Sequence, residues 1–426
     1  MKHIAVVGAG ITGVTTCYSL LKRGYSVTVF DENRYAAMQT SFANGGQLSA
    51  SNAEVWTQTS TILKGLKWMF KRDAPLLVNP KPDWHKYSWM AEFLSNIPSY
   101  EKNTVETVRL AIAAREHLRE WAQHENIDFD LETRGILHIY PDKSGYEHAT
   151  RVNAMLEKGG LERFAVTTEE MKSIEPALSG KLYGGYFTPS DSTGDIHKYT
   201  RGLAEACLRL GAGFVYDARA NTLQNEKNGV RVDFYQSGHT TSESSVFDGV
   251  VICAGVESRR LAAQVGDRVN VYPVKGYSIT INLPDETSQK AAPWVSMLDD
   301  DAKLVTSRLG DDRLRIAGTA EFNGANLDIR DDRIRPMVSW SRRYFPDVDT
   351  EHVVPWAGLR PMMPNMMPRI GAGKLPGIYY NTGHGHLGWT LSAATAELVG
   401  DVIAQSMPVE KKVGVGAIKA ELKNAI

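Results

Sequence analysis

The first 31 residues place a strand, a glycine turn, a helix and a second strand in close succession. Apolar runs at 3–7 and 26–30 predict two buried parallel strands, and the helix between them begins in the glycine turn at 8–13. Gly8 permits a tight bend, Gly10 lets backbone N–H groups approach a pyrophosphate, and Gly13 allows close contact of helix and strand. Asp31 ends the second strand, where a carboxylate accepts hydrogen bonds from an adenosine ribose. The pattern predicts a dinucleotide-binding unit and leaves NAD and FAD open.

Length and composition narrow the class of protein. A chain of 426 residues favours two domains, each with its own core. Its 48 basic and 49 acidic residues nearly balance, which argues against a general attraction to nucleic acid. The three cysteines, Cys17, Cys207 and Cys253, form no cluster of metal-binding spacing, so we expect neither a disulfide nor a metal site.

The start of the chain and its hydropathy indicate where in the cell the protein is expected. The first predicted strand begins at residue 3, which leaves no room for a cleavable signal sequence, and no run of 18 apolar residues exists to span a bilayer. We therefore expect a cytoplasmic protein. The segment 62–78 mixes bulky apolar residues with lysines and an arginine, a pattern typical both of an interfacial segment and of a lid packed on its own domain. The first interpretation would place the protein peripherally on the inner face of the cell membrane.

The remaining elements predict two sheets in two domains. We expect an α/β fold, in which a Rossmann-like domain binds the dinucleotide and an α+β domain with a mainly antiparallel sheet binds the substrate. The first domain is expected to be discontinuous, at 1–55, 145–270 and 356–426, and the second to comprise 56–144 and 271–355. The expected elements are helices at 101–124, 197–210 and 389–404, and strands at 134–140, 184–188, within 213–256, at 271–283, within 303–320 and at 377–381.

Glycine-rich segments favour FAD over NAD. They occur at 8–13, 44–46, 254–255 and 383–388, so that both ends of the chain approach a ligand. NAD usually lies on one contiguous domain, whereas an elongated FAD touched by distant segments explains the pattern better.

Five segments carry a resemblance to a known family. The chain resembles the FAD-dependent amine oxidases and dehydrogenases of the D-amino acid oxidase superfamily and, within it, the small subunit of bacterial D-amino acid dehydrogenases. The matches extend over nearly the whole chain, and no requirement of the fold alone would produce all five. The segments are 40–47, 67–70, 272–278, 358–361 and 381–390.

The resemblance implies how the cofactor is held. FAD is expected to be bound non-covalently, because the sulfur link of some relatives needs a cysteine near the last glycine turn and none follows Cys253. The loop 41–49 is expected along the flavin, and the turn 383–388 aims the positive N-terminus of the last helix at it. Each segment has a simpler interpretation as a plain turn. The expected cofactor-binding residues are Gly8, Ala9, Gly10, Ile11, Thr12, Gly13, Asp31, Glu32, Ser41, Asn44, Gly45, Gly46, Gln47, Leu48, Ala220, Ala254, Gly255, Gly358, Gly383, His384, Gly385, His386, Leu387, Gly388, Trp389 and Thr390.

The same resemblance implies the substrate site. Arg360 matches the family's arginine that grips a substrate carboxylate, for which a guanidinium offers a bidentate fork, although a structural ion pair fits the residues alone equally well. Tyr272 and Tyr277 lie five residues apart on one strand and point to opposite faces, and we expect Tyr277 to line the site. His386 is expected to bond the substrate amine or the flavin, or else to anchor its own turn.

The implied reaction is oxidative deamination of a D-amino acid to a 2-oxo acid and ammonia, by hydride transfer from the α carbon to flavin N5. Electrons would pass to a non-oxygen acceptor such as a quinone. An oxygen-using amine, glycine or D-amino acid oxidase and a proline or hydroxyproline dehydrogenase are alternatives, and a partner-dependent or non-catalytic flavoprotein is the alternative from another class. The preferred amino acid and the oligomeric state stay open.

Overall fold

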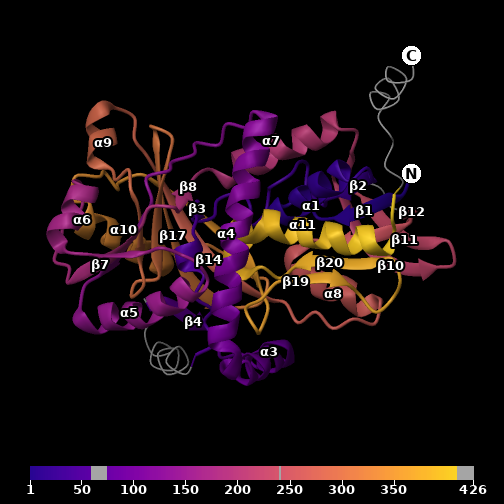
Figure 1. Ribbon diagram of the computed structural model, residues 1–426, viewed down its shortest axis with the longest axis horizontal. Helices are drawn as coiled ribbons and strands as arrows, with labels where there is room; N and C mark the ends of the chain where they lie inside the picture. The colour runs from indigo at the N-terminus through magenta and orange to yellow at the C-terminus, as the bar shows by residue number, and fades with distance from the viewer. Residues whose placement is uncertain (59–73, 239–240, 410–426) are drawn as a thin grey trace, which may run out of the picture.

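The computed structural model describes residues 1–58, 74–238 and 241–409. Two lobes flank a long helix, α4 (Tyr100–Glu125), which crosses the middle of the view in Figure 1. One lobe is built on a six-stranded sheet and the other on a nine-stranded sheet. The two-sheet architecture predicted from the sequence is confirmed.

The six-stranded sheet is the predicted Rossmann-like unit. Its strands run parallel, except that β19 pairs antiparallel with β20. Successive side chains of a strand point to opposite faces of the sheet, so the residues of β1 pack alternately into two different cores. Ile4 and Val6 pack with α1, α7 and α11, whereas Ala5 and Val7 pack with β10, β11 and α8. The strands, in sheet order, are β19 (Arg369–Ala372), β20 (Ile378–Thr382), β13 (Gly249–Ile252), β1 (His3–Val7), β2 (Ser26–Phe30) and β9 (Gly213–Val215).

Helices and a small sheet cover the two faces of that sheet. The elements are α1 (Ile11–Lys22), α7 (Ile196–Arg209) and α11 (Gly388–Ser406) on one face, and β10 (Ala218–Glu226), β11 (Gly229–Gln236), β12 (Glu243–Phe247) and α8 (Ser258–Gln264) on the other.

The nine-stranded sheet forms the second lobe. Most of its pairs are antiparallel, with parallel pairing only at β15–β5 and β17–β4 within the described residues. α10 (Asp331–Tyr344) packs its apolar side on this sheet. The strands, in sheet order, are β18 (Val353–Met362), β14 (Tyr272–Asn282), β17 (Arg313–Phe322), β16 (Leu304–Leu309), β15 (Ser296–Asp299), β5 (Ile136–Tyr140), β7 (Gly184–Thr188) and β6 (Phe164–Val166), with β4 (Leu76–Val78) beside β17.

Shorter elements complete the chain. They are β3 (Gln47–Leu48), which pairs with β8 (Ser192–Thr193), and the helices α3 (Trp84–Ser95), α5 (Lys143–Lys158), α6 (Thr168–Ile174) and α9 (Glu286–Ala291), with single 3-10 turns at Ala50–Asn52, Ile97–Ser99, Gly255–Glu257 and Gly385–Leu387.

Sheet membership departs from the predicted domain boundaries in three places. β6 and β7 fall within 145–270 but belong to the nine-stranded sheet, as does the part of β18 that follows residue 355. α4, expected in the substrate domain, packs its Leu118 and Trp121 into the core beneath α11. The chain crosses between the lobes repeatedly, and a local pattern does not reveal which distant strand will pair with a given strand.

None of the helices in the described part is both long and apolar enough to cross a bilayer. The basic segment at 62–72 lies outside the described residues, and 76–78 forms β4, which pairs with β17.

Candidate active site

A cavity of about 670 Å³ gathers most of the predicted residues. It extends from the glycine turn of β1, past the 37–49 loop, to β14, β17 and β18 of the other lobe. Its size is ordinary for a small-molecule site. Of the residues predicted from the sequence, only Ala9, Gly13, Gly46 and Leu48 do not line it.

The glycine turn is built as the sequence predicts. A Cβ on Gly8 would lie 2.6 Å from the carbonyl oxygen of Cys253, and one on Gly13 would lie 1.7 Å from the carbonyl oxygen of Gly8. These two glycines therefore let strand and helix touch. Gly10 differs, because a Cβ there would meet only Ser41 Oγ, at 3.5 Å, and the position borders the cavity. The first N–H of α1 donates to Ser41 Oγ at 3.0 Å.

Asp31, expected to bind the adenosine ribose, also forms hydrogen bonds within the protein. Its Oδ2 accepts the N–H of Ala9 at 2.6 Å, and its Oδ1 accepts the N–H of Asn33 at 2.9 Å. The carboxylate thus fixes the glycine turn to the end of β2. Glu32, beside it, also lines the cavity and accepts from Gln39 Nε2 at 2.7 Å.

The loop at 41–49 is held rigidly against the second lobe. Ser278 and Ser307 donate to the carbonyl oxygens of Ala43 and Gly45, at 2.9 and 2.6 Å. A Cβ on Gly45 would lie 2.7 Å from Val305. Farther along, the buried carboxylate of Asp191 accepts the N–H groups of residues 50 and 51. The loop therefore has one defined path along the cavity wall.

Five buried polar atoms on the cavity wall lack a hydrogen-bond partner among the described residues. Buried polar groups are normally paired, so such a concentration indicates a polar ligand. The atoms include acceptors and donors, as a dinucleotide with donors and acceptors along its length requires. They are Gln47 Oε1, Thr319 Oγ1, His384 Nδ1, His386 Nδ1 and Trp389 Nε1. Four of the five belong to predicted cofactor-binding residues, so the chain fits such a cofactor.

Arg360 is a half-buried cation with no acidic partner among the described residues. Its guanidinium lies over Gly276 of the neighbouring strand, where a Cβ would come within 2.4 Å of Nη2. Nη1 donates to the carbonyl oxygen of Thr319 at 2.6 Å, and Nη2 donates to that of Gly318 at 3.3 Å. Burial lowers the pKa of Arg360 to about 10, so it keeps its charge at neutral pH. Among the described residues it forms no ion pair, which leaves the guanidinium free for an anionic ligand.

The two histidines of the last turn are neutral acceptors. Burial, with Arg360 nearby, lowers the pKa of His386 to about 3, and burial alone lowers that of His384 to about 3. The Nε2 of His386 donates to the carbonyl oxygen of Asn52 at 3.4 Å, and its ring stacks on Trp56 at 4.8 Å. Because Nε2 carries the proton, Nδ1 is left as an acceptor at the cavity wall. His386 thus both anchors its turn and presents an acceptor.

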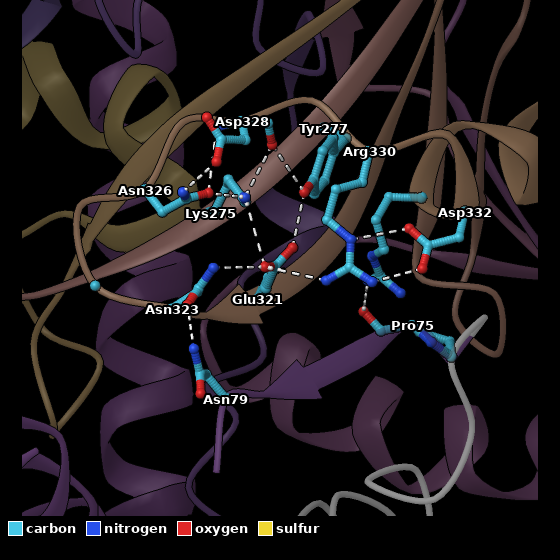
Figure 2. Close-up of polar contacts among 12 residues, drawn as sticks. Pro75, Asn79, Lys275, Tyr277, Glu321, Asn323, Asn326, Asp328, Arg330 and Asp332 are labelled. Atoms are coloured by element: carbon cyan, nitrogen blue, oxygen red, sulfur yellow. Dashed lines mark hydrogen bonds and ion pairs between the residues drawn. The ribbon is translucent and has the colours of Figure 1, made fainter. Parts of the chain in front are cut away.

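Tyr277 does not use its hydroxyl in the cavity. Gly276 faces Arg360, whereas the ring of Tyr277 borders the cavity and packs into the core of the nine-stranded sheet. The Tyr277 hydroxyl donates to Glu321 Oε2 at 2.7 Å, and Figure 2 shows the ring directed at that carboxylate. Burial and this carboxylate raise the pKa of Tyr277. Tyr277 lines the cavity, as expected from the sequence, but its hydroxyl is engaged by Glu321, so a contact between this hydroxyl and the substrate stays a prediction.

The other tyrosine of the pair is also engaged elsewhere. Tyr272 accepts the N–H of Gly324 at 3.1 Å and stacks on Phe322 at 5.6 Å. The two rings lie in different cores, as the five-residue spacing predicts, but neither hydroxyl is directed at Arg360.

Sequence reasoning missed part of the cavity wall. Trp56, Gly276 and Thr319 line it next to Arg360 or His386, and polar side chains line a further part. The one local signal was the run of small residues at 317–320 inside a strand pattern, which is typical of a bulge or a close approach. The further polar residues are Glu54, His148, Arg151, Asp300 and Lys303.

Comparison with known proteins identifies the family. The family model described as FAD dependent oxidoreductase matches residues 3–402. The chain belongs to this family. It is 61% identical over 412 residues to D-amino acid dehydrogenase 3 of Mesorhizobium japonicum, covering 97% of this chain and 99% of that protein. It is 40% identical over 413 residues to a D-amino acid dehydrogenase of Paramagnetospirillum magneticum, covering 94% of each.

Solved structures share the fold at low sequence identity. A glycine oxidase from Geobacillus kaustophilus matches with a TM-score of 0.74 and 20% identity, covering 97% of this chain and 98% of that chain. An L-proline dehydrogenase from P. horikoshii matches with a TM-score of 0.74 and 17% identity, covering 97% and 95%. Members of this family use FAD.

Proposed function

We propose that this protein is an FAD-dependent dehydrogenase that oxidises free D-amino acids to 2-oxo acids and ammonia. The observation that carries the proposal is the charged guanidinium of Arg360, which forms no ion pair with a described residue and borders the cavity that the glycine turn and the start of α11 also line. The D configuration rests on the relatives named D-amino acid dehydrogenase.

The chain supplies positions for the cofactor along the whole cavity. The glycine turn at 8–13 would hold the pyrophosphate, Asp31 and Glu32 the ribose, and 44–47 with 383–390 the ring system. FAD supplies the two-electron acceptor when it is bound. The N-terminus of α11 favours added negative charge at that end of the cavity.

Arg360 and His386 orient the substrate. A carboxylate accepts two parallel hydrogen bonds from a guanidinium, which fixes the α carbon relative to the cavity wall. His386 Nδ1 is an acceptor for the substrate amine. Since the pKa of His386 is about 3, it positions the amine and does not take up its proton at neutral pH.

The electron acceptor is proposed to be a quinone or another non-oxygen acceptor, on the strength of the dehydrogenase names. Hydrogen peroxide formed in air at the rate of substrate loss would contradict this part and identify an oxidase.

Anaerobic titration of the purified holoenzyme tests the proposal. D-Alanine, D-phenylalanine, D-arginine and D-glutamate, with their L enantiomers and both prolines, would be added while the flavin absorbance is followed. We expect bleaching by D-amino acids and none by L enantiomers. Bleaching by L-proline alone would identify a proline dehydrogenase, and no bleaching by any compound would refute the proposal.

A further inference from the structure

A strained bulge lies directly beneath Arg360. In the pairing of β14 with β17, Lys275 is opposite Glu321 and Tyr277 is opposite Gly318, so Thr319 and Ala320 together face Gly276. Thr319 has a φ of 55°. A β-branched residue rarely adopts this left-handed conformation, and such outliers are retained where the surrounding structure holds them for a purpose.

The bulge turns main-chain acceptors toward the guanidinium. Without it, the carbonyl groups of β17 would alternate between neighbouring strands. Instead the carbonyl oxygens of Gly318 and Thr319 both accept from Arg360. The bulge therefore fixes the orientation of Arg360 from one side while Gly276 leaves room for it.

The same bulge places a buried hydroxyl group, without a described partner, in a residue of the cavity wall. Thr319 is 5% exposed and lines the cavity, and its Oγ1 is buried with no hydrogen-bond partner among the described residues. The carbonyl oxygen of the same residue accepts from Arg360 Nη1 at 2.6 Å, so Thr319 is a direct neighbour of the guanidinium. A buried hydroxyl beside an unpaired cation is suited to an anionic ligand that both can donate to.

A buried polar network fixes the far side of the bulge (Figure 2). Glu321 accepts from the Tyr277 hydroxyl at 2.7 Å and from Asn323 Nδ2 at 3.1 Å. Its Oε1 lies 3.5 Å from the ammonium group of Lys275, which is completely buried and donates to Asn326 at 2.7 Å. Lys275 and Tyr277 flank Gly276, so this network holds the segment of β14 that the guanidinium of Arg360 covers. It accounts for the Lys275-Gly276-Tyr277 sequence, in which alternate residues serve opposite faces.

We infer that Thr319 is a substrate-binding residue, whose hydroxyl donates a hydrogen bond to the carboxylate that Arg360 holds. The inference rests on the proposed function, since it needs a carboxylate at Arg360. A carboxylate has more acceptor positions than the two that a guanidinium fork occupies, so a third donor can be satisfied at the same time. The contact is independent of the substrate side chain and should act equally on every amino acid that the enzyme accepts.

Steady-state kinetics of holoenzyme variants test the inference, with each D-amino acid of the panel that bleaches the wild-type flavin. Thr319→Val keeps the branched shape and removes the hydroxyl. We expect KM to rise about 10- to 100-fold, the range for a lost hydrogen bond to a charged group, with kcat within about threefold. Thr319→Ser should restore KM to within about threefold of wild type. If the valine variant fails to fold, Thr319→Ala provides the same measurement.

A matched control separates binding from structure. Thr188 in β7 is also fully buried with no partner for its hydroxyl among the described residues, but it does not line the cavity. Thr188→Val should leave KM unchanged. In an Arg360→Ala background, Thr319→Val should cause little further loss, because the two residues act on one carboxylate.

The outcomes distinguish the inference from the function on which it rests. An unchanged KM in Thr319→Val, with or without a lower unfolding temperature, would overturn the inference alone. Weaker FAD binding with an unchanged KM would assign the hydroxyl to the cofactor and would also overturn it. If Arg360→Ala itself leaves KM unchanged, the proposed substrate site is wrong.

Discussion

The substitution Gly276→Ala tests whether the position of the Arg360 guanidinium over Gly276 determines substrate affinity. The added Cβ would lie 2.4 Å from Nη2, 2.5 Å from Cζ and 2.7 Å from Nη1 of Arg360. Ordinary contact begins near 3.4 Å, so the guanidinium must withdraw by about 1 Å. It can do so because it borders the cavity, and we therefore expect folding to be little affected.

We expect the displaced guanidinium to lower the catalytic efficiency. A displacement of about 1 Å at a positioning group lowers the rate about 100-fold, which equals about 2.7 kcal/mol of transition-state stabilisation. We expect kcat/KM to fall by about that factor, mainly through KM, while the FAD content and the unfolding midpoint stay close to wild type. The assay is dye-coupled turnover of a D-amino acid, with FAD content measured by absorbance.

Gly213→Ala is the matched control. Gly213 lies in the edge strand β9, where a Cβ would meet only the side chain of Thr28, at 3.3 Å or more. Its kinetics should equal those of wild type. A wild-type KM in Gly276→Ala would refute the reasoning, since it would mean that the position of the guanidinium over Gly276 does not matter for substrate binding.

Three further predictions concern charge. Arg360→Ala should raise KM at least about 100-fold with FAD still bound, measured by kinetics and absorbance, and normal turnover at low substrate would contradict the carboxylate assignment. Glu321→Gln removes the charge that faces buried Lys275 and should lower the free energy of unfolding by about 3 kcal/mol in urea titrations; an unchanged midpoint would show that the network adds no stability. Burial lowers the pKa of His138 from 6.5 to about 4, so only the unfolded chain gains this proton at pH 5. The free energy of unfolding should therefore fall by about 2 kcal/mol from pH 7.5 to 5 through this group, and His138→Gln should remove that slope; an equal slope in the variant would disprove the assignment.

The sequence predicted the nucleotide-binding lobe well because its signals are local. A glycine turn between two apolar strands restricts the backbone within a dozen residues, and β1, α1 and β2 form where the pattern places them. The same holds for β20, the last glycine turn and α11. The resemblance to a family added Arg360 and the loop at 41–49, and both line the cavity.

The substrate side was harder to predict because it depends on pairing between distant strands. The spacing of Tyr272 and Tyr277 correctly indicated opposite faces, yet it did not show which face holds Arg360. That was decided by the register of β18 on β14, in which Gly276 and not Tyr277 meets the guanidinium. Sheet membership differs from the predicted domain boundaries for the same reason, since β6, β7 and β18 pair with strands far away in the chain.

By itself, the sequence determined the elements and the kind of chemistry, because turns, strands and helices follow from neighbouring residues. Only the tertiary structure decided what surrounds Arg360. A one-residue bulge in β17 gives Thr319 its left-handed conformation and turns its carbonyl oxygen toward the guanidinium, with its hydroxyl on the wall of the same cavity. A bulge arises from the pairing of two strands and has no fixed signature in either one, so the arrangement at the substrate site became apparent only once β14, β17 and β18 were aligned.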